Sequence, residues 1–192
     1  MRLFVALAVS DEIRQGISSF IRELSITEPQ VRWINPQNLH ITLKFIGRVA
    51  TDNLSAIADA LVKVRVAQPV QIDFRGLGFF PNARRPSVAW IGTELSPNLP
   101  ALAAAINTEL ATVGIPREEK AFVPHLTIAR FKEARLSAGL LTKIESLQDR
   151  GFGTLTATEF HLVESNLKGT GAQYTTLRSF RFVLDHREGN YS

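Results

Sequence analysis

Two short segments of the chain share a pattern of residues that can transfer protons. Leu39–Phe45 reads LHITLKF and Pro124–Arg130 reads PHLTIAR, so each contains a histidine followed two positions later by a threonine. Because side chains alternate along a β-strand, each histidine shares a face with its threonine while their apolar neighbours enter the core. Each segment is therefore expected to present one imidazole and one hydroxyl to the same surface.

The two segments occupy equivalent places in an internal repeat. His40 and His125 are 85 residues apart (125 − 40), and the same shift carries predicted strands onto strands and helices onto helices. We therefore expect an α+β fold that is bilobal, with pseudo-twofold duplicated αβ lobes and antiparallel sheets around a central cleft. The chain is expected to be a single bilobal domain over residues 1–192, with intertwined repeat halves at approximately 1–80 and 87–184.

Two imidazoles that face each other across a cleft fit an in-line displacement at phosphorus. The ordinary pKa of histidine is about 6.5, so one imidazole can remove a proton from water while the other, protonated, donates a proton to the leaving oxygen. Thr42 and Thr127 can donate hydrogen bonds to the non-bridging oxygens of the phosphoryl group. Because the motifs are nearly symmetric, their spacing does not determine whether His40 or His125 is the acid.

The elements that must position these residues are about four helices and seven strands. Apolar residues at three- and four-residue intervals predict helices that begin after Ser10, after Thr51, after Pro97 and near Ser137, the last ending at Gly151. A first buried strand is expected within Met1–Ser10. Further β-rich runs predict strands at Leu39–Ile46, Val70–Leu77, Val88–Thr93, His125–Arg130, Leu155–Val163 and Gln173–Leu184.

Composition limits the chemistry and the partners. The chain has 22 Lys+Arg, 18 Asp+Glu, a net charge of +4 and no Cys. The positive charge favours an anionic partner, and the absence of cysteine excludes disulfides, iron–sulfur clusters and thiol nucleophiles. Neither His-x-His nor His-Glu-x-x-His occurs, and no acidic residue adjoins either motif histidine. We therefore expect neither a metal nor another cofactor.

The sequence also bears on location. No apolar run approaches the roughly 18 residues of a membrane span, so we expect no membrane partner. The apolar stretch Leu3–Val9 is at the lower limit for a signal peptide and runs into Asp11 and Glu12. A cytoplasmic monomer is the resulting expectation.

The paired motifs and their surroundings resemble the two-histidine phosphoesterase superfamily, in particular its RNA 2′,3′-cyclic phosphodiesterase branch, historically called 2′-5′ RNA ligase. The resemblance covers nearly the whole chain and includes the opening RLFVAL, the loop GLGFFPNARRP and the late ESNL. It implies a bilobal α+β fold with the motifs facing each other in a central groove. It also implies hydrolysis of an RNA 2′,3′-cyclic phosphate end to a 2′-phosphomonoester, with His40 as proton donor and His125 as proton acceptor.

The resemblance adds two residues that lie five positions after the histidines. It implies that Arg130 binds phosphate and that Phe45 stacks on a base. Strict alternation would instead turn both side chains into the core. For Phe45 we expect this core packing rather than base stacking. For Arg130, a bulge at the end of the strand would turn the guanidinium back to the cleft, since burying it unpaired would be costly. Lys44 shares the face of His40 by alternation and is either a phosphate contact or a solvated lysine.

Two alternatives to this function remain open at this point. One is a phosphodiesterase that acts on another cyclic phosphate or on a 2′-5′ linkage. The other is a non-catalytic RNA-binding module that uses a basic cleft without turnover, consistent with a pI of about 9.8. Outside the motifs, His161 and His186 are expected to be structural or solvated, and Arg84 and Arg85 to lie in a solvated turn, with RNA backbone contact as the alternative.

Overall fold

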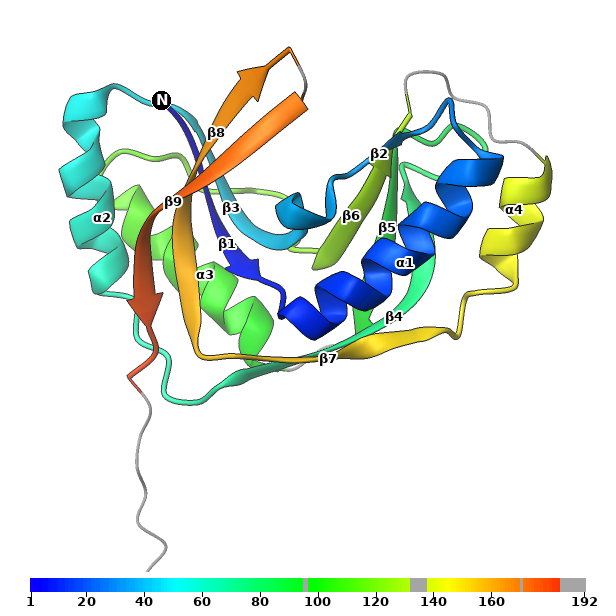
Figure 1. Cartoon of the computed structure of the whole chain (residues 1–192). Helices are drawn as coiled ribbons and strands as arrows, with labels where there is room; N and C mark the ends of the chain where they lie inside the picture. Colours follow the sequence, from blue (N-terminus) through cyan, green and yellow to red (C-terminus); the bar gives the residue numbers. More distant parts are fainter. Residues whose placement is uncertain (95–96, 132–137, 170, 184–192) are drawn as a thin grey trace, which may run out of the picture.

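The computed structural model describes residues 1–94, 97–131, 138–169 and 171–183 (Figure 1). Its strands are β1 (Arg2–Ala8), β2 (Arg32–Trp33), β3 (His40–Arg48), β4 (Val70–Phe80), β5 (Val88–Glu94), β6 (His125–Arg130), β7 (Gly151–Ala157), β8 (Glu159–Lys168) and β9 (Gly171–Arg181). Its helices are α1 (Asp11–Thr27), α2 (Leu54–Val62), α3 (Asn98–Ala111) and α4 (Ala138–Glu145), with short 3₁₀ helices η1 (Pro36–Asn38) and η2 (Thr51–Asn53). The predicted α+β class is confirmed.

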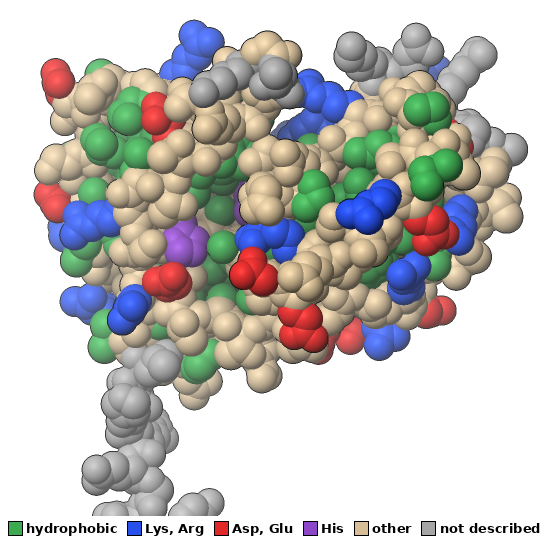
Figure 2. All heavy atoms as spheres, in the orientation of Figure 1, with side chains coloured by type: hydrophobic (Ala, Val, Ile, Leu, Met, Phe, Trp, Pro, Cys, Tyr) green, Lys and Arg blue, Asp and Glu red, His purple; other side chains and the backbone are tan. Residues whose placement is uncertain are grey.

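The strands form one antiparallel sheet in the order β7-β4-β5-β6-β3-β1-β8-β9, with β2 added beside β6. The two motif strands, β3 and β6, are therefore neighbours at the centre of this order. They align through the pair Ile41↔Leu126 and then diverge, so the sheet folds into two halves. We predicted sheets around a central cleft, and these are two halves of one sheet whose surface is hollowed between them (Figure 2).

The helices cover the outer faces of the two halves. Figure 1 shows α2 and α3 beside β3, β1, β8 and β9, and α1 and α4 beside the other half. Helix α1 follows β1 along the chain yet packs on the opposite half, where the rings of Phe20 and Phe152 lie 5.2 Å apart. The chain therefore crosses between halves, and a single hydrophobic core contains residues from both.

Local sequence explains why α1 forms where it does. The Ser10 side chain accepts a hydrogen bond from the backbone N–H of Ile13, which caps the first turn, and Asp11 and Glu12 complement the helix dipole there. Five apolar side chains recur on one face and are buried: Ile13, Ile17, Phe20, Ile21 and Leu24. Burial of each contributes about 1.5–3 kcal/mol, so the face fixes the helix on the sheet.

Three expectations about the elements were incomplete or wrong. The predicted strand Leu155–Val163 is two strands, because the chain leaves β7 at Ala157 and enters β8 in the other half of the sheet, between β1 and β9. The fourth helix ends at Glu145 rather than at Gly151, where β7 already pairs with β4. Strand β2 was not predicted, since two residues carry no periodic signal. Ser137, Leu184 and His186 lie outside the described residues.

Within the described residues, no helix is both long and apolar enough to cross a bilayer.

Candidate active site

Each motif strand contains a β-bulge at an equivalent position, and β3 has a second register shift further along, at Ile46. In β3 the register with β1 skips Leu43, and in β6 the register with β5 skips Ile128. These residues are 85 positions apart (128 − 43), which is the spacing of the two histidines. A bulge adds a residue to one strand only, so it reverses the face to which the following side chains point.

The bulges turn Phe45 and Arg130 outward. In both strands the skipped residue and the one after it are buried, and the next residue is exposed. Phe45 is 61% exposed, so the expectation of core packing is wrong, because simple alternation does not include the bulge. Arg130 is exposed on the side of its histidine, as the bulge hypothesis predicted.

The same bulge removes Lys44 from the face of His40. Its side chain is 5% exposed, and Nζ donates to the Pro116 carbonyl oxygen at 2.7 Å. Both expectations for Lys44, a phosphate contact and a solvated lysine, are therefore wrong. Burial lowers the pKa of the Lys44 ammonium, and the nearby charge of Glu118 raises it.

His40 is oriented through both ring nitrogens. Nδ1 lies 2.7 Å from the Asn38 carbonyl oxygen, and Nε2 lies 3.0 Å from Thr42 Oγ1. A carbonyl oxygen only accepts hydrogen bonds, so Nδ1 carries a proton and Nε2 is the nitrogen that can gain or lose one. The Asn38 side chain in turn donates to Ala172 O at 2.8 Å, which ties η1 to β9. Asn38 was not singled out from the sequence, since its role depends on this contact.

His125 is held in the matching way. Its Nδ1 lies 2.7 Å from the Val123 carbonyl oxygen, again two residues earlier in the chain. Nδ1 therefore donates, and Nε2 is left as the nitrogen that exchanges protons. In both motifs the strand supplies the histidine, and the carbonyl group two residues earlier selects its tautomer.

The register of β3 and β6 sets the four motif side chains around one point. Because Ile41 aligns with Leu126 in antiparallel strands, His40 lies toward Thr127 and Thr42 lies toward His125. The two histidines are diagonal to each other, and so are the two threonines. All four are half-buried. The structure thus brings together the four residues that the motifs predict.

Burial and like charge both act on the histidines. Burial lowers the pKa of His40, the hydrogen bond to Asn38 O raises it, and the charges of His125 and Arg130 lower it. Burial also lowers the pKa of His125, with its bond to Val123 O raising it and the charge of Arg130 lowering it. Arg130 therefore acts on both imidazoles, and the pair resists taking up two protons.

Aromatic rings flank each imidazole, and sequence reasoning did not identify them. His40 lies 4.8 Å from Phe4 and 5.2 Å from Tyr174, ring centre to ring centre. Phe80 meets His125 edge-on at 4.9 Å. These rings come from β1, β9 and β4, far from the motifs in sequence. Phe4 lies in the quoted segment RLFVAL and Phe80 in GLGFFPNARRP, so the resemblance of these segments was the available signal for those two rings.

Trp90 forms a further part of the frame around His125. Its ring centre is 5.2 Å from that of Phe80 and 6.5 Å from that of His125. A side chain at Gly78 would overlap the indole, so this glycine is needed for the close approach. Within the described residues, Trp90 Nε1 is buried without a hydrogen-bond partner.

The other candidates from the sequence lie outside this constellation. His161 Nδ1 lies 2.9 Å from Ser179 Oγ, which agrees with the structural role expected of it. Burial lowers its pKa, and the Glu159 carboxylate raises it. Arg84 and Arg85 are exposed in a turn where both backbone N–H groups donate to Asn82 Oδ1. Among the described residues, no three His, Asp or Glu side chains are grouped closely enough to hold a metal ion.

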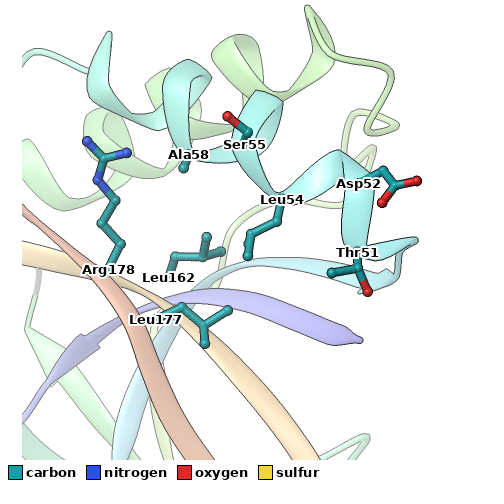
Figure 3. A pocket seen from close by; sticks show the side chains of 8 residues that line it. All are labelled: Thr51, Asp52, Leu54, Ser55, Ala58, Leu162, Leu177 and Arg178. Atoms are coloured by element: carbon teal, nitrogen blue, oxygen red, sulfur yellow. The ribbon is translucent and has the colours of Figure 1, made fainter.

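A hollow of about 400 Å³ lies elsewhere, between α2 and strands β8 and β9 (Figure 3). It is lined mainly by apolar side chains such as Leu54, Leu162 and Leu177, with Arg178 at its side. None of the motif residues lines it. A binding site is ordinarily sought in an apolar pocket, but here the groups that can do chemistry lie on the other face of the sheet.

Comparisons with known proteins agree with this geometry. A family model described as the 2′-5′ RNA ligase superfamily matches residues 11–169. An RNA 2′,3′-cyclic phosphodiesterase of Archaeoglobus fulgidus is 37% identical over 180 residues, which cover 94% of this chain and 99% of that protein. The protein of the same name from Methanothermobacter thermautotrophicus is 34% identical over 94% of this chain and 98% of its own length.

Solved structures show a similar fold. TT0787 of Thermus thermophilus has a TM-score of 0.82 at 27% identity, covering 97% of this chain and all of that one (100%). E. coli LigT complexed with 3′-AMP has a TM-score of 0.76 at 25% identity, covering 95% of this chain and 98% of that one.

Proposed function

The chain belongs to the 2′-5′ RNA ligase superfamily, and from this premise we propose that it hydrolyses RNA ends that carry a 2′,3′-cyclic phosphate. The observation that carries the proposal is the pair of histidines with the same tautomer, each beside a threonine, on one face of the sheet. The names of the relatives supply the substrate class. The product is proposed to be a 2′-phosphomonoester.

The proposed mechanism uses the two Nε2 atoms, with the donor and acceptor roles that the family resemblance implies. His125 Nε2, unprotonated, accepts a proton from a water molecule, whose oxygen attacks phosphorus. His40 Nε2, protonated, donates its proton to the departing 3′ oxygen on the opposite side. The water oxygen thus joins phosphorus as the P–O3′ bond breaks, and the protons balance when the two histidines exchange theirs with solvent.

The remaining residues stabilise the anion. Thr42 and Thr127 donate hydrogen bonds to the non-bridging oxygens, and the Arg130 guanidinium offsets the charge on them. His40 Nε2 lies 3.0 Å from Thr42 Oγ1, so the proposed proton donor and one of the proposed phosphate-binding hydroxyls are side by side. Phe45 is exposed, with its ring centre 6.5 Å from that of Phe4, and its proposed role is to stack on the terminal base.

Turnover of a nucleoside 2′,3′-cyclic phosphate is expected to persist in EDTA and to need no nucleoside triphosphate. The physical reason is that imidazole and hydroxyl groups supply the acid, the base and the anion contacts. Formation of the nucleoside monophosphate is measured with and without chelator. Loss of turnover that a divalent ion restores would exclude the metal-free mechanism, whereas RNA binding without any turnover would favour the non-catalytic module.

The pH dependence of kcat/KM is expected to be bell-shaped, with its maximum below about pH 6.5, the ordinary histidine pKa. Burial lowers the pKa of both histidines, so the state with one proton on the pair is populated at lower pH than in free imidazoles. Raising the pH from that maximum removes the acid, and lowering it protonates the base. The two apparent pKa values belong to the pair.

This profile is measured on the mononucleotide substrate, with circular dichroism at each pH to show that the protein is folded. A maximum above about pH 7.5 would contradict the argument, because both groups are desolvated in the free protein.

A further inference from the structure

Two arginines lie directly opposite each other at the mouth of the active site. Arg32 of β2 is the register partner of Arg130 of β6. Opposite residues of antiparallel strands share a face, with Cβ atoms about 4.5–5.5 Å apart, and like charges placed this way destabilise the pairing. Both side chains are exposed, and neither forms an ion pair with any carboxylate among the described residues.

The neighbouring residues fix the direction of Arg32. Trp33 packs against the core, and its Nε1 donates to the Glu28 carbonyl oxygen at 3.1 Å. Alternation therefore turns Arg32 to the opposite face, which is the face that the β6 bulge gives to Arg130. The pair thus borders the four motif side chains.

Arg32 also reaches toward the other half of the sheet. Its Nη2 lies 3.9 Å from the position that a Cβ on Gly171 would take, at the start of β9. In Figure 1 the hairpin of β8 and β9 leans toward β2 across the cleft, and Figure 2 shows Lys and Arg side chains gathered in that gap. The guanidinium therefore lies between β2 and the start of β9, on the side of the cleft.

Electrostatics separate the roles of the two arginines. The charge of Arg130 lowers the pKa of both His40 and His125, whereas Arg32 is not among the causes for either histidine. Arg130 is therefore close to the reacting phosphate, and Arg32 lies one step further out. An anion between the two guanidinium groups would be bound by Arg32 on its outer side.

We propose that Arg32, together with Arg130, forms a second phosphate subsite that binds the phosphodiester on the 5′ side of the terminal nucleotide. This rests on the proposed function. Guanidinium groups match phosphate oxygens as planar, two-pronged donors, and an anion between them relieves the like-charge repulsion. A mononucleoside cyclic phosphate lacks that phosphodiester, so the subsite selects an RNA chain over a free nucleotide.

The test compares Arg32→Gln with Arg48→Gln. Arg48 is a matched control because it is also paired with an arginine, its register partner Arg2 on the neighbouring strand β1. It lies at the opposite end of β3 from His40. Both variants lose one positive charge. For each, kcat/KM is measured on adenosine 2′,3′-cyclic phosphate and on a short oligoribonucleotide with a 2′,3′-cyclic phosphate end, over a range of salt concentrations.

We expect Arg32→Gln to lower the ratio of oligonucleotide to mononucleotide kcat/KM by about 10-fold, the scale of one charged hydrogen bond. The salt dependence on the oligonucleotide should weaken by about 0.7 in log–log slope, as for one lost contact to single-stranded nucleic acid. Arg48→Gln should keep the wild-type ratio. An unchanged ratio in Arg32→Gln, or an equal fall in Arg48→Gln, would overturn the subsite.

The subsite and the proposed function can fail separately. If the wild-type protein turns over neither substrate, the proposed function is wrong. Binding of a fluorescent oligoribonucleotide that ends in a 2′-phosphate, followed by anisotropy, then tests the subsite alone. Arg32→Gln should weaken that binding about 10-fold more than Arg48→Gln, and equal binding by the two variants would contradict the subsite.

Discussion

Replacement of either motif histidine by alanine is expected to lower turnover of a 2′,3′-cyclic phosphate by about 10²–10⁴-fold, the range for loss of one proton-transfer group. Both imidazoles are half-buried in the cleft, outside the main hydrophobic core, so the fold should survive. The two variants should differ in pH profile. His125→Ala removes the base and with it the limb that rises with pH, and His40→Ala removes the acid and the limb that falls.

His161→Ala is the matched control for these variants. It removes a histidine of the same sheet that bonds Ser179 and lies outside the proposed machinery. Turnover is measured as formation of the nucleoside monophosphate, and circular dichroism establishes that each variant is folded. If a folded His40→Ala or His125→Ala protein kept turnover within a few-fold of the wild type, the two-imidazole mechanism would be wrong.

The second large effect is in the identity of the product, which is expected to be almost wholly the 2′-phosphate. In-line attack requires the acid to stand behind the oxygen that leaves, so a donor and an acceptor fixed on different strands accept one orientation of the cyclic phosphate. If His40 is the donor and the ribose docks with its 3′ oxygen toward His40, as the family resemblance implies, that oxygen departs and the phosphate stays on the 2′ position.

Phosphorus NMR resolves the two monophosphates, with authentic adenosine 2′- and 3′-monophosphate as standards. Uncatalysed hydrolysis run in parallel provides the comparison for an unselective reaction. A predominantly 3′-phosphate product would reverse the acid and base assignment and the docking of the ribose, while leaving the protein a phosphodiesterase.

The duplication of the fold stays a prediction that the strand order supports. A shift of 85 residues moves the bounds of α1, 11–27, to 96–112, and α3 spans Asn98–Ala111. Strands β3 and β6 are adjacent at the centre of the sheet, as a twofold axis between them requires. The intertwined halves are consistent with α1 and α3 each packing on the half that does not contain the preceding strand.

The sequence by itself determined the local features of this protein. Alternation placed His40 with Thr42 and His125 with Thr127, because the twofold period of a strand belongs to the strand alone. Apolar spacing and the Ser10 cap located α1 for the same reason, since periodicity and capping act within one helix. These effects depend on residues a few positions apart.

Only the tertiary structure decided the features that depend on neighbouring strands. The bulges at Leu43 and Ile128 exist because β1 and β5 skip those residues in their register, and they turn Phe45 and Arg130 to the cleft. The rings around His40 and the pairing of Arg32 with Arg130 likewise join residues distant in sequence. Hydrogen bonds between strands fix such contacts, and the pattern within a single strand contains no record of its partner's register.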